Sequence, residues 1–295
     1  MPRAKRPNGI ELEYITAGSP SDQPLILVMG FTAQLIAWPQ ELIDQLVAAG
    51  FFVILHDNRD CGLSSKLDGV EVDMMAAVTA LQTGDLSAVH GKSPYTLSDF
   101  SDDAFAVLDD LGIDRAHIAG ASMGGMIVQT MAIEHPERVR SMASIMSTTG
   151  EFEYGQSSPE AQVALLTPPP PDRAGVIEAA TKASVWSSQR YFDVDAARER
   201  AAAAYDRSFY PEGIARQMIA IMASGPRGDA LCGVTVPTVV IHGADDQLIT
   251  PSGGERTASL IPDAKYVLVE DMGHDLPIPL LPTIVEAIAT NAARG

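Results

Sequence analysis

Apolar runs and amphipathic stretches alternate along most of the chain. Short apolar runs predict buried strands, and apolar residues three or four positions apart predict helices. Predicted strands cover residues 10–17, 25–29, 52–56, 116–121, 139–146, 238–242 and 266–269. Predicted helices cover residues 39–49, 97–111, 123–134, 253–260 and 280–292. This alternation is typical of a mostly parallel sheet with helices on both faces, and we place the strand 10–17 at an edge of it.

The pattern breaks between residues 150 and 233 and then resumes. This stretch holds a run of four prolines, helical pieces near residues 176–183 and 196–204, and scattered aromatic residues. A segment that interrupts a strand–helix series and returns to it predicts an inserted helical cap. We therefore divide the chain into a first part of the core (1–149), the cap (150–233) and a second part of the core (234–295).

Composition narrows the class of protein. The 295 residues are 46% hydrophobic and 20% charged, as in a globular chain, and the formal net charge is −18. Such a charge repels phosphate backbones and anionic lipid surfaces, so we expect no nucleic-acid partner. We expect no membrane span and, because the basic N-terminus lacks the apolar run of a signal peptide, a cytoplasmic protein. The oligomeric state cannot be inferred from the sequence.

The two cysteines, Cys61 and Cys232, stand far apart and match no zinc-ligand spacing. No phosphate-binding loop or dinucleotide fingerprint is present either. We therefore expect a protein that works without a metal or an organic cofactor.

A short motif, Gly120-Ala-Ser122-Met-Gly124, follows a predicted strand and begins a predicted helix. It fits the G-x-S-x-G nucleophile elbow, in which the serine occupies a strained strand-to-helix turn and larger flanking residues would collide with neighbouring backbone. The alternative is a small-residue helix start with Ser122 as its N-cap. The strand–turn–helix context favours Ser122 as a nucleophile.

A serine nucleophile needs a histidine base, and the base needs a carboxylate to orient it. His274 lies in a loop between the last predicted strand and the last helix, where parallel sheets place their chemistry. Asp245 and Asp246 lie in the preceding loop of this kind, and we prefer Asp246 because it opens the approach to the following helix. The order Ser122, Asp246, His274 is the order that this motif requires.

A tetrahedral intermediate needs backbone N–H groups to bind its oxyanion. The residue after the nucleophile, Met123, supplies one donor, and the loop after the strand 25–29 supplies the other, which we assign to Phe31. We expect the substrate to contact the side chains of Phe31, Met123, Trp186, Met218 and Met222. For the three residues of the cap, the alternative is that they form the cap's own core.

Five segments together resemble the α/β-hydrolase superfamily over nearly the whole chain. They are Val28-Met-Gly30 with Trp38-Pro39, Asp57–Ser64, Gly120–Gly125, Gly243–Asp246 and Gly273-His274. The chain looks like a bacterial subgroup of serine esterases that includes aclacinomycin methylesterase and mycobacterial carboxylesterases or lipases. The resemblance implies an eight-stranded, mostly parallel sheet. We interpret Asp57 and Arg59 as a structural ion pair near the site.

These observations predict a carboxylic ester hydrolase that acts through an acyl-enzyme on small to medium apolar or aromatic esters. Its partner would be a small-molecule ester. Three alternatives use the same fold: a thioesterase or phospholipase, a C–C bond hydrolase with the same triad, and a binding protein of low turnover. The sequence does not choose the acyl chain or the alcohol.

Overall fold

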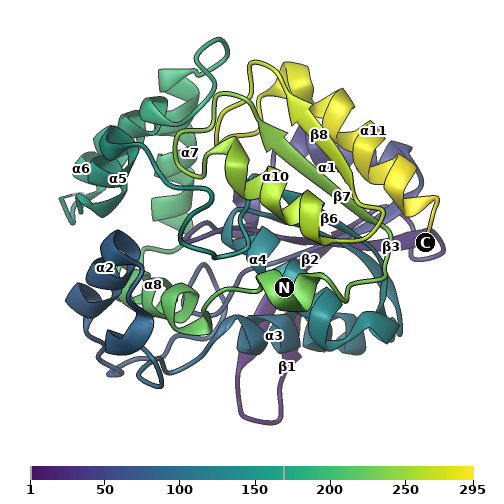
Figure 1. Ribbon diagram of the computed structural model, residues 1–295, viewed down its shortest axis with the longest axis horizontal. Helices are drawn as coiled ribbons and strands as arrows, with labels where there is room; N and C mark the ends of the chain where they lie inside the picture. The colour runs from purple at the N-terminus through teal and green to yellow at the C-terminus, as the bar shows by residue number, and fades with distance from the viewer. Residues whose placement is uncertain (1, 169) are drawn as a thin grey trace.

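The computed structural model describes residues 2–168 and 170–295, and its centre is one eight-stranded sheet (Figure 1). The strands are β1 (Arg3–Lys5), β2 (Glu11–Ala17), β3 (Gln23–Val28), β4 (Phe51–His56), β5 (Ala116–Ala121), β6 (Val139–Ile145), β7 (Thr238–Gly243) and β8 (Lys265–Val269). Their order across the sheet is β1-β2-β4-β3-β5-β6-β7-β8. β1 and β2 pair antiparallel, β2 pairs antiparallel with β4, and the other neighbours are parallel.

The helices of the described residues fall into those that flank the sheet and those that do not. They are α1 (Gln40–Ala48), α2 (Met74–Thr83), α3 (Leu97–Asp110), α4 (Met123–Glu134), α5 (Pro159–Leu166), α6 (Arg173–Ala179), α7 (Val194–Arg207), α8 (Glu212–Ser224), α9 (Gly228–Leu231), α10 (Pro251–Leu260) and α11 (Leu281–Ala292). α1 and α11 pack on one face of the sheet, and α3, α4 and α10 pack on the other. The three-layer α/β architecture predicted from the sequence is confirmed.

Two apolar cores lie on the two faces of the sheet. One joins Leu25, Leu27 and Val53 to the buried sides of α1 and α11, and the other joins Ile26 and Ile54 to α3 and α4. Successive residues of a strand point to opposite faces, so β3 and β4 feed both cores and are apolar at nearly every position. This explains why a continuous apolar run marks the central strands.

The edge position predicted for the strand 10–17 is wrong. β1 pairs along its outer side, with Ala4 opposite Leu12, so β2 is the second strand of the sheet. β1 has only three residues, and Arg3 and Lys5 are basic, so the sequence shows no strand pattern there. The Ala4 side chain is nevertheless fully buried, and this burial explains why the segment pairs.

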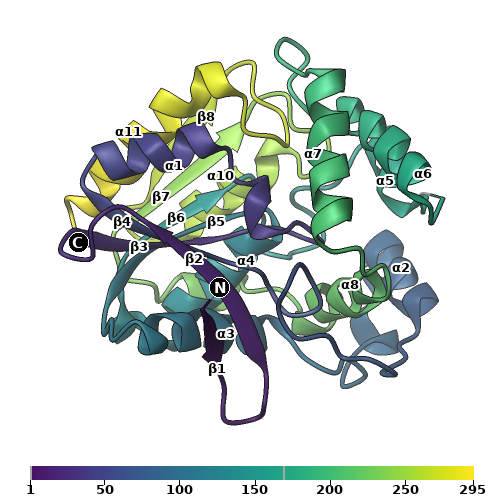
Figure 2. The same ribbon diagram turned by 180° about the vertical axis from the view of Figure 1, so that it is seen from behind.

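The segment 150–233 forms helices α5 to α9, of which α5 to α8 gather together with α2 on one side of the molecule, away from the C-terminus (Figures 1 and 2). α2 and α8 share a small apolar cluster that includes Ala77, Ala80, Met218 and Ile219. Residues 66–96 and 150–233 therefore build one helical face although they are far apart in the sequence.

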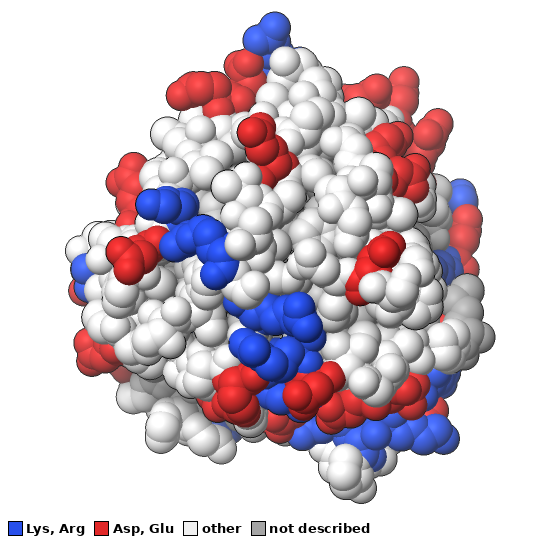
Figure 3. Space-filling view, turned by 90° about the vertical axis from the view of Figure 1, so that its right-hand side faces the viewer, with Lys and Arg blue, Asp and Glu red and all other residues white. Residues whose placement is uncertain are grey.

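Uncharged side chains cover most of the face in Figure 3, and the charged ones form no single large patch on it. Acidic side chains lie around its periphery, and the basic ones form a short band with acidic neighbours. Within the described part of the chain, no helix is both long enough and apolar enough to cross a bilayer.

Candidate active site

Ser122 lies at the carboxyl end of β5, on the turn into α4. Its backbone has φ 58° and ψ −120°, a left-handed conformation that is strained for a residue with a side chain. A Cβ on Gly120 would overlap the backbone of Gly124, and one on Gly124 would overlap the Val28 carbonyl. Both glycines of the motif are therefore required by the packing of α4 against the sheet. The serine N–H donates to the Ile145 carbonyl at 2.9 Å, which ties the turn to β6.

Asp246 and His274 are in contact at the same edge of the sheet as this turn. His274 Nδ1 lies 2.7 Å from Asp246 Oδ2, and the Asp246 side chain is fully buried. The other carboxylate oxygen of Asp246 accepts the N–H groups of Leu248 and Ile249, each at 2.9 Å. Burial raises the pKa of this carboxyl, but His274 and His242 beside it outweigh that effect, so the pKa lies below its ordinary value. The carboxylate is thus held in its charged form and oriented toward one imidazole.

A second histidine, His242, lies behind the carboxylate. Its Nε2 lies 2.7 Å from the Ile249 carbonyl oxygen and 3.5 Å from Asp246 Oδ2. A carbonyl oxygen only accepts, so Nε2 carries the proton in this arrangement. A Cβ on Gly254 would overlap this ring. The sequence analysis did not assign His242 to the site, because a histidine inside an apolar strand carries no local sign of its neighbours.

Asp245 is only half-buried, and it contacts the site through its backbone. Its N–H donates to the Met272 carbonyl at 2.9 Å, which joins the loop after β7 to the loop after β8. Of the two adjacent aspartates, Asp246 is therefore the one whose carboxylate reaches His274.

Ser122 and His274 are not hydrogen-bonded to one another in the structure of residues 2–168 and 170–295. β5, β7 and β8 are parallel strands of one sheet, and each of these residues follows a strand's carboxyl end. In free enzymes such catalytic hydrogen bonds are often long and shorten when substrate binds. The structure brings the acid and the base into contact, and it places the serine on the same edge of the sheet.

The loop after β3 packs directly on the serine. A Cβ on Gly30 would lie 3.0 Å from the Ser122 Cβ and 3.4 Å from its Oγ, so a side chain at this position would push the loop and the serine slightly apart. The next residues are held by the side chain of Gln217 in α8, whose Oε1 accepts the Thr32 N–H at 2.8 Å. Within the described residues, no group of the chain accepts a hydrogen bond from the N–H of Phe31 or of Met123. These two donors are available to a ligand at Ser122.

A cavity of about 380 Å³ opens on Ser122. Four of the five expected contact residues, Phe31, Met123, Met218 and Met222, line it. The fifth, Trp186, lies outside this lining. Its carbonyl oxygen accepts a hydrogen bond from the backbone N–H of His274 at 2.6 Å. Further lining residues that the sequence analysis did not identify include Leu165, Ile221, Tyr154, Glu151 and Arg227. Their stretch of the chain has no periodic pattern from which a lining position could be recognised.

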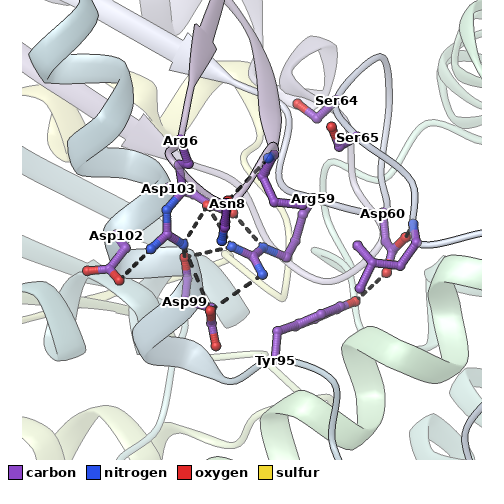
Figure 4. A network of polar contacts seen from close by, with 12 residues as sticks. Arg6, Asn8, Arg59, Asp60, Ser64, Ser65, Tyr95, Asp99, Asp102 and Asp103 are labelled. Carbon is purple, nitrogen blue, oxygen red and sulfur yellow. Dashed lines mark hydrogen bonds and ion pairs between the residues drawn. The ribbon is translucent and has the colours of Figure 1, made fainter. Parts of the chain in front are cut away.

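The predicted ion pair between Asp57 and Arg59 is wrong, because each residue pairs with a different partner. Asp57 lies 2.7 Å from Arg207 in α7, and Arg59 forms a two-point contact with Asp103 in α3 at 2.7 Å. Figure 4 shows the Arg59 guanidinium between Asp99 and Asp103, with Arg6 on the far side. Both charges are buried, as expected, but their partners lie far along the sequence.

A third buried pair, missed by the sequence analysis, joins the sheet to the helical face. Asp60 accepts from Arg216 in α8 at 2.7 and 3.0 Å and from the Tyr95 hydroxyl at 2.7 Å. Asp60 has φ 62°, a left-handed backbone conformation that aspartate tolerates better than most residues with a side chain. Together, Asp57 and Asp60 fix the loop after β4 to α7 and α8.

The profile described as "alpha/beta hydrolase fold" matches residues 23–279, and the chain belongs to this family. Among proteins of known function, rhodomycin D methylesterase of Streptomyces peucetius is 28% identical, over 93% of this chain and 92% of that protein. A 2-hydroxy-6-oxononadienedioate/2-hydroxy-6-oxononatrienedioate hydrolase of Cupriavidus pinatubonensis is 26% identical, over 79% of this chain and 73% of that protein. The resemblance to an esterase subgroup of this superfamily is confirmed at the level of the family and its esterase relatives.

Solved structures show the same fold. An enol-lactonase from Burkholderia xenovorans superposes with a TM-score of 0.72 at 22% identity, over 99% of this chain and all of that one. The enol-lactonase shares the fold, and the family match and the curated relatives make this chain a member of a hydrolase family that includes a methylesterase and a dienedioate hydrolase.

Proposed function

We propose that this protein is a carboxylic ester hydrolase with Ser122 as nucleophile, His274 as base and Asp246 as the acid that orients it. The observation that carries the proposal is the 2.7 Å contact between His274 Nδ1 and the buried Asp246, at the same edge of the sheet as a strained serine that lines a cavity. An ion-paired histidine by itself is often structural. Its position on the same sheet edge as the elbow favours a catalytic role.

The proposed reaction begins when Ser122 Oγ attacks the ester carbonyl carbon and His274 Nε2 takes the hydroxyl proton. The negative charge moves to the carbonyl oxygen, where the free N–H groups of Phe31 and Met123 bind it. His274 then gives its proton to the departing alcohol, which leaves an acyl-serine. Water, deprotonated by His274, attacks this acyl group and releases the acid, which restores the serine.

Asp246 keeps the proton of the resting imidazole on Nδ1, and it stabilises the imidazolium that forms during the attack. Two backbone N–H groups and the two histidines keep it ionised at neutral pH. Several hydrogen bonds hold the Asp246 carboxylate in place, and the carboxylate in turn holds the His274 imidazole. The imidazole therefore loses little freedom when the transition state forms.

The substrate proposed for this site is a small to medium ester with an apolar or aromatic part. Phe31, Met123, Met218 and Met222 give the cavity an apolar and adaptable wall, and its volume suits a ligand of this size. The methylesterase relative, which spans nearly the whole chain, supports an ester rather than a C–C bond. We also propose that residues 150–233 act as the cap of this site, since α8 supplies both methionines and the Gln217 contact to the oxyanion loop.

A second candidate is a C–C bond hydrolase with the same residues. The dienedioate hydrolase relative, at 26% identity, is the observation in its favour. The two reactions differ in the bond broken, and substrate panels separate them.

The test is turnover of 4-nitrophenyl esters from acetyl to dodecanoyl, beside a vinylogous diketone substrate for the second candidate. We expect steady release of 4-nitrophenol with the highest kcat/KM at a medium chain length, and an acyl adduct on Ser122 by mass spectrometry. Ser122→Ala should lower kcat/KM by about a thousandfold or more with an unchanged melting temperature. Turnover of that variant at the parent's rate would refute the assignment of Ser122. One equivalent of nitrophenol without turnover would indicate a binding protein, and faster diketone cleavage would favour the second candidate.

A further inference from the structure

Three arginines of this protein are buried, and one of them differs from the other two. Arg59 and Arg216, with 3% and 4% exposure, form two-point ion pairs with Asp103 and Asp60. Arg227, with 8% exposure, forms no ion pair with any described carboxylate. Its hydrogen bonds go to neutral acceptors: Gln129 Oε1 at 3.1 Å, the Thr148 carbonyl at 2.8 Å and the Gly225 carbonyl at 3.3 Å.

An unpaired buried charge is unfavourable, because a guanidinium loses its hydration without gaining a counter-charge. Burial lowers the pKa of Arg227 to about 10, which still leaves it charged at neutral pH. A guanidinium has five N–H donors, and Arg227 uses one on each of its three nitrogens. One N–H therefore remains on each of the two terminal nitrogens. In general, the two terminal nitrogens of a guanidinium can together donate to both oxygens of a carboxylate.

Arg227 lies on the wall of the cavity that opens on Ser122. Its anchor Thr148 lines the same cavity. The hydroxyl of Ser147, which precedes Thr148 in the chain, donates to the Ser122 carbonyl at 2.8 Å. The charge is thus linked to the elbow through two consecutive residues. A ligand that reaches Ser122 shares the cavity with this cation.

The acidic residue nearest to this part of the wall does not neutralise Arg227. Glu151 also lines the cavity, but Arg256 holds both of its oxygens at 2.8 Å, and this pairing keeps its pKa below the ordinary value. Arg256 thus already neutralises the Glu151 carboxylate. Glu153, the other acidic residue of the lining, is exposed to solvent. Among the described residues that line the cavity, Arg227 is therefore a buried cation without an ion-paired carboxylate.

We infer that Arg227 binds a carboxylate carried by the substrate, so that the preferred esters are half-esters of dicarboxylic acids. This inference rests on the proposed ester hydrolysis and adds the charge of the substrate to it. The apolar wall would hold the chain between the two ends, while Arg227 would fix the end that does not react. Because the acid group is bound before and during attack, the preference is expected in KM more than in kcat.

The test compares mono-4-nitrophenyl adipate with 4-nitrophenyl 6-methylheptanoate, whose isopropyl end has the shape of the carboxylate. The readout is the ratio of their two kcat/KM values. We expect the parent protein to favour the adipate, and Arg227→Gln to lower the ratio by about tenfold or more, mainly through the KM of the adipate. Arg227→Lys should keep part of the preference. An unchanged ratio in Arg227→Gln, or a parent protein that disfavours the adipate, would overturn the inference.

The control is Gln129→Met, which removes a neutral partner of Arg227 and retains the charge. If Arg227 is only structural, both variants lower the two kcat/KM values equally and their ratio does not move, which refutes the inference. Binding of monomethyl adipate to Ser122→Ala, measured by calorimetry with and without Arg227→Gln, does not depend on turnover. Loss of binding in the double variant supports the inference even if the ester reaction fails, and equal binding overturns it even if esters are hydrolysed.

Discussion

The site has two walls that are built in different ways. The sheet wall, made of the loops that carry Ser122, Asp246 and His274, is fixed by backbone packing and by glycines that leave no room for a side chain. The helical wall, made of α2, α8 and the segment 150–158, lines the opposite part of the cavity, and the buried Asp60–Arg216 pair joins α8 to the loop after β4 of the sheet. In the proposed function, the sheet wall carries the reacting groups and the helical wall selects the substrate that fits beside them.

The largest loss of stability is expected when the Asp60–Arg216 pair, which joins α8 of the helical wall to the sheet, is broken. Arg216→Met removes one partner and leaves Asp60 as a buried charge, which costs about 3–5 kcal/mol of unfolding free energy in such cases. Denaturant unfolding measures this loss. Arg198→Met is the control, because its pair with Glu178 is exposed and should contribute less than about 1 kcal/mol. Equal losses in the two variants would mean that the pair does not couple the walls.

A smaller but more local effect is expected at the elbow. Gly124→Ala places a methyl group against the Val28 carbonyl, so α4 must move away from β3. Forced contacts in packed interiors typically cost about 1–3 kcal/mol. We expect a lower melting temperature together with a loss of esterase activity, since α4 carries the Met123 N–H. Gly233→Ala, whose new methyl group would lie 3.5 Å from the Ala230 carbonyl oxygen, is the control and should keep both stability and activity. Full activity in Gly124→Ala would show that the elbow is not rigid.

The smallest effect concerns pH and is confined to the sheet side. His117 in β5 is hydrogen-bonded to Ser141 and Gln23, and burial lowers its pKa from 6.5 to about 4. The unfolded chain takes up this proton first as the pH falls, so the histidine's contribution to stability is complete above pH 6.5 and is lost between pH 6.5 and 4. His117→Gln should flatten the curve of unfolding free energy against pH in that window. A curve parallel to the parent's would contradict this assignment.

The sequence predicted the sheet wall better than the helical wall, for a physical reason. The elbow, the strand order along the chain and the aspartate and histidine loops depend on residues close in sequence, such as Gly120 and Gly124 around Ser122. The ion pairs depend on residues far apart: Asp57 pairs with Arg207 and Asp60 with Arg216, about 150 positions away. A chain carries no local sign of such partners, which is why Asp57 and Arg59 were wrongly paired with each other.

The same limit applies to the cavity. Met218 and Met222 are one helical turn apart in α8, and this spacing indicates a common face but not what that face contacts. Trp186 was expected at the substrate because it is large and aromatic. In the structure its carbonyl, a group that every residue has, makes the contact with His274. Backbone contacts of this kind leave no trace in residue type.

That contact has a kinetic consequence. The backbone N–H of His274 donates to the Trp186 carbonyl in the segment before α7, so any displacement of this segment that admits a bulky ester would also shift His274, the proposed base. Entry of a bulky ester and proton transfer by His274 would then occur one after the other and not at the same time. Turnover of large esters would become sensitive to solvent viscosity, while small esters, which enter without that displacement, would be hydrolysed at a rate that viscosity does not change.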